Sequence, residues 1–226
     1  MFFQRNYDRP GPGIPTDAPE KKGVALYGAI LIRELFEMVK LNLLYLLFCL
    51  PLVTIPAAST ALCRVTLAMV RDSPRFLWVE FRDAFKGDFI QSTIAGALYF
   101  FGVAAASCAV WFYLAAAGNN PVFYLLLAVA LLVLLVLVMA GLYLFPLIAL
   151  VDLPLRAIGK NALLLVFACL PRSLLALVCC GVMLFLAVAF FPLSIPVVVL
   201  LWPALINFTT TFCIYGGIRD HVLRQE

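Results

Sequence analysis

Residues 89–151 read FIQSTIAGALYFFGVAAASCAVWFYLAAAGNNPVFYLLLAVALLVLLVLVMAGLYLFPLIALV and contain no charged residue. A second uncharged stretch, residues 173–218, reads SLLALVCCGVMLFLAVAFFPLSIPVVVLLWPALINFTTTFCIYGGI. Each stretch is long enough for two membrane-spanning helices, at about 20 apolar residues per crossing. Turn-forming residues lie near the middle of each one, at 118–121 and at 191–196. The two stretches therefore predict two helical hairpins in a membrane.

The composition supports the same fold class. The chain has 226 residues, of which 65% are hydrophobic and 12% are charged. Soluble domains carry about 25% charged residues, so an all-α, polytopic transmembrane bundle is expected. We predict one transmembrane domain over residues 24–218, between a flexible cytosolic tail at 1–23 and a short cytosolic tail at 219–226. The first tail is polar and rich in Pro and Gly, without the apolar core of a signal peptide.

The region before the first hairpin is largely apolar but interrupted by prolines. Residues 24–50 predict a helix with a charged first half and an apolar second half, ended by Pro51 and Pro56. Residues 57–71 are small and apolar, which permits close packing of helices in lipid. This segment is short for a complete crossing. It is compatible with a tilted span, a re-entrant half-helix or the continuation of one bent crossing.

Lysine and arginine indicate the orientation. The basic residues lie in the segments between the hairpins, whereas the turns inside the hairpins carry no charge. The positive-inside rule places the basic segments in the cytoplasm. We prefer about six crossings, with both ends of the chain cytoplasmic, because this keeps the basic residues of the first 40 positions inside. The alternative is about five crossings with the N-terminus outside.

Residues 74–89 predict an amphipathic cytosolic helix with aromatic residues at every fourth position and basic residues beside them. Such a helix suits the interface between lipid headgroups and water, although it also suits docking of a cytosolic partner. We interpret it as a lipid surface. The candidate residues for the lipid or partner surface are Trp78, Phe81, Arg82, Phe85, Lys86, Lys160 and Arg172.

Polar groups and bends within the apolar segments are the other candidates, because polar side chains are costly in lipid and often functional there. Asn207 and the threonines after it are compatible with a polar pocket. We favour a simpler role, in which they donate hydrogen bonds to neighbouring helices. The candidate positions are Asn42, Thr54, Pro56, Ser59, Thr60, Arg64, Asn207 and Thr210.

Residues suited to catalysis or metal binding are scarce. The seven cysteines form no C-x-x-C pair, and the single histidine is His221 near the C-terminus. After residue 90 the only carboxylate side chains are Asp152, Asp220 and Glu226. We therefore expect no enzyme, no metal site and no cofactor. The net charge of +4 is spread through loops that would face lipid headgroups, so we expect no nucleic-acid binding.

Short motifs resemble those of a known family. The run from Pro51 to Leu62, PLVTIPAASTAL, is similar to the P-x-x-T-I-G-P-A-x-x-A-L stretch of the YesL-like family of bacterial integral membrane proteins (domain of unknown function 624). Phe81, Phe85 and Lys86 resemble its F-x-x-x-F-K pattern. The segment from Phe145-Pro146 through Asp152 to KNAL at 160–163 resembles its later loop. This chain has Pro56-Ala57 where the family commonly has Gly-Pro.

The resemblance covers most of residues 28–218 and implies a multi-pass protein of the bacterial cytoplasmic membrane. It also implies an association with carbohydrate uptake, since family members are often encoded beside such systems. We expect the lipid bilayer as the first partner and a membrane transport complex as the second. The sequence leaves open whether copies of the chain associate with one another.

Two functions follow as hypotheses. The preferred one is an accessory or scaffold component of a carbohydrate uptake system, which binds through its helices or its cytosolic surface. The alternative is a small transporter or channel for a sugar-related solute, with a site at the Pro51–Pro56 break or near Asn207.

Overall fold

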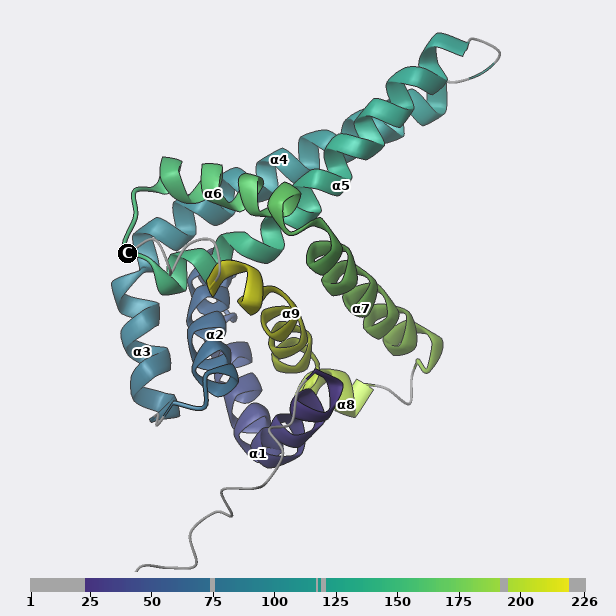
Figure 1. Ribbon diagram of the computed structural model, residues 1–226. Coiled ribbons are helices and arrows are strands. Elements are labelled where there is room, and N and C mark those ends of the chain that lie inside the picture. Colours follow the sequence, from purple (N-terminus) through teal and green to yellow (C-terminus); the bar gives the residue numbers. More distant parts are fainter. Residues whose placement is uncertain (1–22, 74–75, 117, 119–120, 192–194, 220–226) are drawn as a thin grey trace, which may run out of the picture.

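The structure is a computed structural model that describes residues 23–73, 76–116, 118, 121–191 and 195–219. All regular elements in these ranges are helices (Figure 1). The two predicted tails, apart from Gly23 and Arg219, and the centres of the two predicted turns lie outside the described residues. The helices are α1 (Val24–Phe48), the short 3-10 helix η1 (Leu52–Thr54), α2 (Ile55–Val70), α3 (Leu77–Gly87), α4 (Phe89–Ala116), α5 (Pro121–Leu150), α6 (Leu155–Ala168), α7 (Leu170–Ala189), α8 (Ile195–Leu200) and α9 (Trp202–Ile218).

The first predicted hairpin is confirmed, because α4 and α5 fill the uncharged stretch 89–151 on either side of the turn residues at 118–121. Pro146 lies inside α5, which continues to Leu150, so the proline does not end this helix. The second hairpin differs from the prediction. Its return segment is split at Leu201 into the short α8 and the longer α9.

Within the described residues, four helical segments are long and apolar enough to cross a membrane. They are Leu52–Val70, which joins η1 to α2, and the helices α4, α5 and α7. Helix α1 carries four charged residues between Arg33 and Lys40, and α9 is only 17 residues long, so neither is among these four. The protein is therefore membrane-embedded, and the number of crossings beyond these segments stays a prediction.

Helix α2 lies at the centre of the molecule. Its apolar window is 61% buried, against 17% for α4 and 11% for both α5 and α7. The first two turns consist almost entirely of small residues, from Ala57 to Ala61, and small side chains let neighbouring backbones approach closely. Pro56 occupies the first turn of the helix, where a missing N–H costs nothing. The ambiguous segment 57–71 thus forms a helix packed against α1, α3, α4, α5 and α9.

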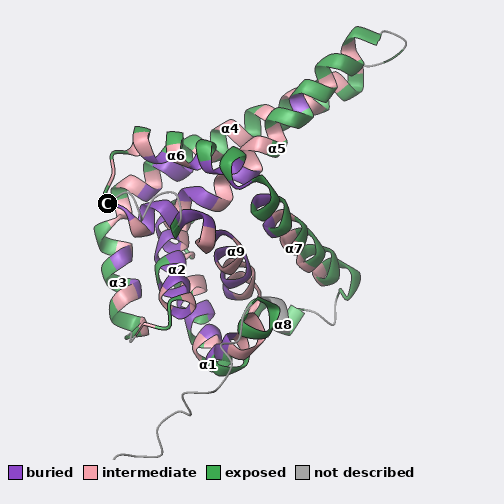
Figure 2. Cartoon of the chain, in the orientation of Figure 1, coloured by how far each residue is buried: buried purple, intermediate pink, exposed green. Residues whose placement is uncertain are grey.

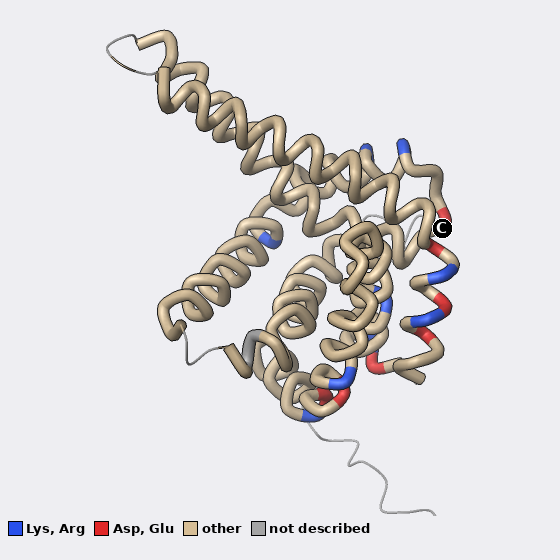
Figure 3. Tube along the Cα trace, turned by 180° about the vertical axis from the view of Figure 1, so that it is seen from behind, with Lys and Arg blue, Asp and Glu red and all other residues tan. Residues whose placement is uncertain are grey.

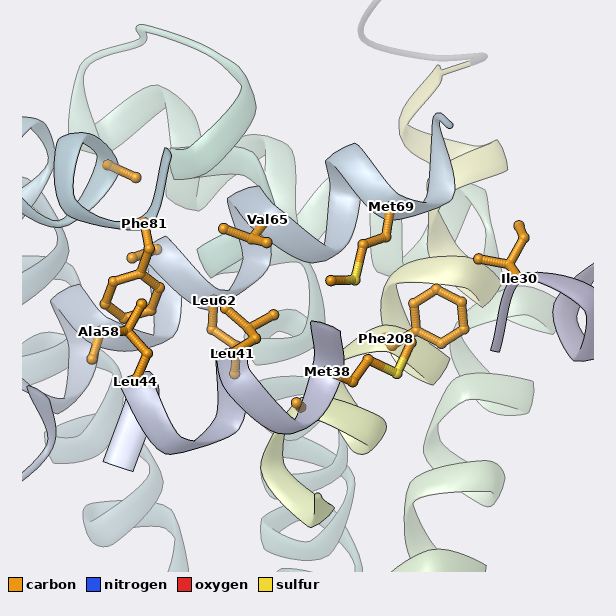
Figure 4. Close-up of a cluster of buried hydrophobic side chains, with 13 residues drawn as sticks. Ile30, Met38, Leu41, Leu44, Ala58, Leu62, Val65, Met69, Phe81 and Phe208 are labelled. Carbon is orange, nitrogen blue, oxygen red and sulfur yellow. The ribbon is translucent and has the colours of Figure 1, made fainter. Parts of the chain in front are cut away.

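One buried cluster joins α1, α2, α3 and α9 (Figure 4). Leu41 of α1 lies beside Leu62 of α2, and Met38 of α1 lies beside Phe208 of α9. Lipid tails are as apolar as these side chains, so within a membrane the cluster is stabilised mainly by close van der Waals packing. The cluster therefore holds the charged first half of α1 against the bundle.

The α4–α5 hairpin extends away from the rest of the molecule (Figure 1). Its distal half is coloured as exposed along much of both helices (Figure 2). Apolar side chains such as Phe101, Trp111 and Leu125 are 76%, 73% and 68% exposed there. Exposed apolar residues on this scale mark a surface that meets lipid or another protein.

The charged residues are concentrated on one side of the molecule (Figure 3). That side holds α3 and the polar half of α1, whereas the tip of the α4–α5 hairpin and the far end of α7 carry no charge. The described ends of α4, α5 and α7 next to the two predicted turns therefore carry no charged residue.

The contact between α2 and α4 leaves no room for a larger residue at Gly96. A Cβ atom on Gly96 would overlap Cβ and Cγ of Pro56. We expect Gly96→Ala to lower the free energy of unfolding by about 1–3 kcal/mol, the usual cost of overpacking. The matched control is Gly102→Ala on the same helix, where an added Cβ meets no atom within 4 Å. Unfolding in mild detergent would measure both, and equal stability of the two variants would contradict the close contact.

Candidate functional site

Asn42 secures the break between α8 and α9. Its side chain is fully buried, donates a hydrogen bond to the Val199 carbonyl at 2.7 Å and accepts one from the Ala204 N–H at 3.1 Å. Pro203 has no N–H, so the Val199 carbonyl four residues earlier cannot receive the usual helical hydrogen bond. Freed backbone groups in a membrane need partners, and the Asn42 amide supplies both a donor and an acceptor. Asn42 is therefore a structural clamp.

Asn207 joins α9 to α2. Its Oδ1 accepts a hydrogen bond from the Thr66 hydroxyl at 2.7 Å, and its Nδ2 lies 3.1 Å from the Cys63 sulfur. Thr210 instead donates to carbonyls of its own helix, those of Ile206 at 2.9 Å and Asn207 at 2.8 Å. The preferred interpretation of Asn207, a hydrogen bond to a neighbouring helix, agrees with this geometry.

The hydroxyl groups near the start of α2 are also engaged. Thr60 is buried and shares a 2.8 Å hydrogen bond with Ser92 of α4. Ser59 donates to the Ile55 carbonyl at 2.8 Å and lies 3.4 Å from the Tyr45 hydroxyl of α1. Thr54 lies within reach of the carbonyls of Phe48 and Pro51, which closes the turn between α1 and α2.

A cavity of about 260 Å³ lies among α1, α2, α5, α7 and α9. The structure brings together Ser59, Asn207 and Thr210 on its wall, which the sequence analysis singled out separately. Asn42, Thr54, Pro56, Thr60 and Arg64 are not part of it. Tyr45 and Cys63 also line it, whereas no charged residue does. The cavity therefore offers hydroxyl, amide and aromatic groups to an uncharged ligand.

Arg64 does not face this cavity but the charged side of the protein. Its guanidinium lies 3.5 Å from the carboxylate of Asp88, the single residue between α3 and α4. Burial raises the pKa of the Asp88 carboxyl, the cation of Arg64 lowers it, and the negative charge of Asp152 raises it again. The net direction is upward, so burial outweighs the ion pair.

Part of the predicted partner surface on α3 is wrong. Phe81 is fully buried, and its ring packs 5.4 Å from the ring of Phe48. Phe85 is half-buried and lies 4.7 Å from the same ring. The fourfold spacing suggested a lipid-facing aromatic row, but it marks the face of α3 that packs toward α2 and the end of α1. Trp78, Arg82 and Lys86 remain exposed, and Arg82 lies 3.8 Å from Asp83.

Lys160 and Arg172 are exposed on other helices and do not join α3 in one continuous surface in the contacts described. The Arg172 guanidinium lies against the last turn of α9, where a Cβ atom on Gly216 would be 3.4 Å from it. A cation at a helix C-terminus is favourable because carbonyl groups are directed outward there.

Several hydrogen bonds between helices were not predicted from the sequence. Ser173 and Tyr143 are both buried and share a 2.7 Å hydrogen bond between α7 and α5. Tyr27 shares a 2.9 Å hydrogen bond with Thr209. A single Ser, Thr or Tyr in an apolar segment does not reveal its hydrogen-bond partner, because that partner lies on a helix distant in sequence. The charged residues Arg71, Glu80 and Asp83 were also missed as a group, although they line a second cavity with Arg64.

Comparison with known families gives one match. Residues 38–109 match the family described as "Protein of unknown function, DUF624", which agrees with the YesL-like resemblance. The match runs from the middle of α1 through α2 and α3 into α4, and so includes the central helix. No curated protein and no solved structure matches the chain. Within the described residues, no group of three or more His, Cys, Asp or Glu side chains is placed to hold a metal ion.

The Asn42 clamp gives a stability prediction. Asn42→Leu leaves the Val199 carbonyl and the Ala204 N–H without their partner, so the free energy of unfolding should fall by about 1–3 kcal/mol. Asn161→Leu, which changes a half-buried amide on α6 in the same way, is the control and should cost less. Unfolding of both variants by SDS titration in mixed micelles measures the difference. A wild-type stability for Asn42→Leu would show that the amide is dispensable.

The burial of Asp88 gives a pH prediction. A carboxyl whose pKa is raised in the fold favours the neutral form, so its contribution to stability is present at acid pH and is lost as the pH rises through the folded pKa. Asp88→Asn, which is always neutral, should therefore melt at a higher temperature than the wild type at pH 7, and the gap should close toward about pH 4. Glu37→Gln, at the exposed pair with Lys40, should change the melting temperature little. A lower melting temperature for Asp88→Asn at pH 7 would mean that the Arg64 pair dominates.

Proposed function

We propose that this chain, whose residues 38–109 match a family of unknown function, is an accessory subunit of a carbohydrate uptake system in the bacterial cytoplasmic membrane. In this proposal the subunit performs no catalysis, and it binds a neighbouring membrane protein through helix α4. The charged side and the C-terminus face the cytoplasm, in agreement with the positive-inside rule. The association with carbohydrate uptake rests on the family resemblance.

The observation that supports a partner on α4 is a difference between the two helices of the projecting hairpin. The outward face of α4 carries the exposed small residues Ala97, Ala104, Cys108 and Ala115 at helical spacing. Aromatic rings, such as those of Phe101 and Trp111, border this face. Helices associate in lipid mainly through small residues, because these allow close backbone approach.

The outward face of α5 is different. It exposes branched apolar residues, including Leu125, Leu132 and Val129, and these suit contact with lipid chains. The hairpin therefore presents a face on α5 that suits contact with lipid and a face on α4 that suits contact with another helix. Since the hairpin extends beyond the bundle, a partner can reach α4 without disturbing the core (Figure 1).

The polar groups between the helices favour the accessory role over a transporter. Asn42, Asn207 and Thr60 are engaged in hydrogen bonds that hold helices together. Ion-coupled transport usually relies on Asp, Glu, His, Lys or Arg side chains within the membrane, and none of these lines the central cavity. The alternative, a small transporter for an uncharged sugar-related solute, is favoured by that cavity, where Tyr45 and Thr210 are available.

Site-specific crosslinking tests the proposal. A photoreactive amino acid at Ala104 of α4 should crosslink to an integral membrane subunit of a transporter in cells, whereas the same group at Ala128 on the exposed face of α5 should crosslink to lipid alone. Mass spectrometry of the crosslinked product identifies the partner. Crosslinks to lipid alone at both positions, together with sugar flux by the purified chain in liposomes, would contradict the accessory role and support the transporter.

A further inference from the structure

A second cavity, of about 480 Å³, lies on the charged side of the protein between α2 and α3. It is distinct from the central cavity and uses none of the residues invoked for the partner face on α4. Its volume is within the range of about 300–1,000 Å³ that small-molecule sites occupy. Charges of opposite sign line its two walls, and this arrangement indicates what kind of ligand it can hold.

The wall formed by α2 is basic. Arg64 and Arg71 are seven positions apart, so they lie on the same face of α2, about 10 Å apart along its axis. Each guanidinium has five N–H donors. Arg64 has a contact of 3.5 Å with Asp88, longer than the roughly 2.8 Å of a strong charge-assisted bond. Arg71 lies 5.4 Å above the ring of Tyr215, a contact that uses none of its donors in a conventional hydrogen bond.

The wall formed by α3 is acidic. Glu80 and Asp83 are three positions apart and therefore share a face of this helix. Ser73, in the connection between the two helices, contributes to the lining at one end. An anion inside the cavity would be attracted by α2 and repelled by α3. A ligand with both a negative and a positive group satisfies both walls.

We propose that this cavity binds the headgroup of a zwitterionic phospholipid of the phosphatidylethanolamine class. The phosphodiester accepts hydrogen bonds from Arg64 and Arg71, which suit phosphate oxygens. The primary ammonium group donates to the carboxylates of Glu80 and Asp83. A phosphatidylglycerol headgroup offers the same phosphate without the ammonium, so the acidic wall disfavours it.

The remaining lining supports a membrane lipid as the source of this headgroup. Leu67 of α2, Val79 of α3 and Leu150 at the end of α5 are apolar and lie beside the charged groups. Val79 is 51% exposed, so an apolar surface continues at the rim of the cavity. The cavity lies where the long apolar helix α5 ends and the charged side begins, the level expected for headgroups.

Lipid binding to the delipidated wild-type protein is the first test. Native mass spectrometry in detergent would compare phosphatidylethanolamine, phosphatidylglycerol and the water-soluble glycerophosphoethanolamine. We expect phosphatidylethanolamine to bind roughly tenfold more tightly than phosphatidylglycerol. Equal or tighter binding of phosphatidylglycerol would overturn the zwitterion proposal, and equally tight binding of the soluble compound would overturn the lipid assignment.

Variants of each wall give the second test. Arg71→Gln should weaken binding of phosphatidylethanolamine and of phosphatidylglycerol, since both use the phosphate. The double substitution Glu80→Gln and Asp83→Asn should weaken only phosphatidylethanolamine and reverse the preference toward phosphatidylglycerol. Arg156→Gln, an exposed arginine of α6 outside the cavity, is the matched control and should bind as the wild type does.

A steric variant covers the case in which a charge substitution prevents folding. Ala68 lines the cavity on α2, so Ala68→Phe should fill part of it while leaving all the charges in place. We expect this variant to elute as the wild type in size-exclusion chromatography and to lose bound phosphatidylethanolamine. Unchanged lipid retention by Ala68→Phe would place the lipid elsewhere and overturn the proposal.

Discussion

Neighbouring helices approach α2 so closely that these contacts determine how the whole bundle is arranged. Pro56 meets Gly96 of α4 so tightly that no side-chain carbon fits between them, and Thr60 bonds to Ser92 near the same contact. On other faces α2 supports the buried cluster with α1 and the Thr66–Asn207 bond to α9. Because van der Waals packing and hydrogen bonds, rather than apolar burial alone, drive helix association in lipid, a central helix of small residues is an effective core. The projecting hairpin and the charged cavity both depend on this helix, since it anchors the base of α4 and forms one wall of the cavity.

Polar residues inside this bundle mostly maintain the fold. The Asn42 amide supplies hydrogen bonds that the α8–α9 break removes from the backbone, and Asn207 connects two helices. Both roles follow from the absence of water as an alternative partner in lipid. The two surfaces proposed for recognition lie elsewhere, on the small-residue face of α4 and between the charged walls of α2 and α3. In these proposals recognition is at the periphery of the protein, whereas the centre maintains the fold.

The sequence predicts the elements whose signal is local. The uncharged stretches locate α4 and α5 almost to the residue, and Pro51 and Pro56 locate the break before α2. It fails where the deciding contact is distant in sequence. The break at Leu201 depends on Asn42, which lies more than 150 residues away. Phe81 was expected on the surface because the same spacing fits both an interfacial helix and a helix packed in the core. It is buried because the ring of Phe48, from another helix, packs against it. The charged cavity combines Arg64 and Arg71 of one helix with Glu80 and Asp83 of another, and neither pair is distinctive alone.

Labelling the protein in native membranes with a lipid-soluble carbene reagent, followed by mapping of the modified peptides, tests whether the neighbouring helices shield α2 from lipid. Peptides from α2, over residues 55–70, should remain at background, whereas peptides from the distal halves of α4 and α5 should be strongly labelled. Labelling of α2 to the same extent as α5 would contradict this shielding, because it would place the small-residue helix at the lipid surface.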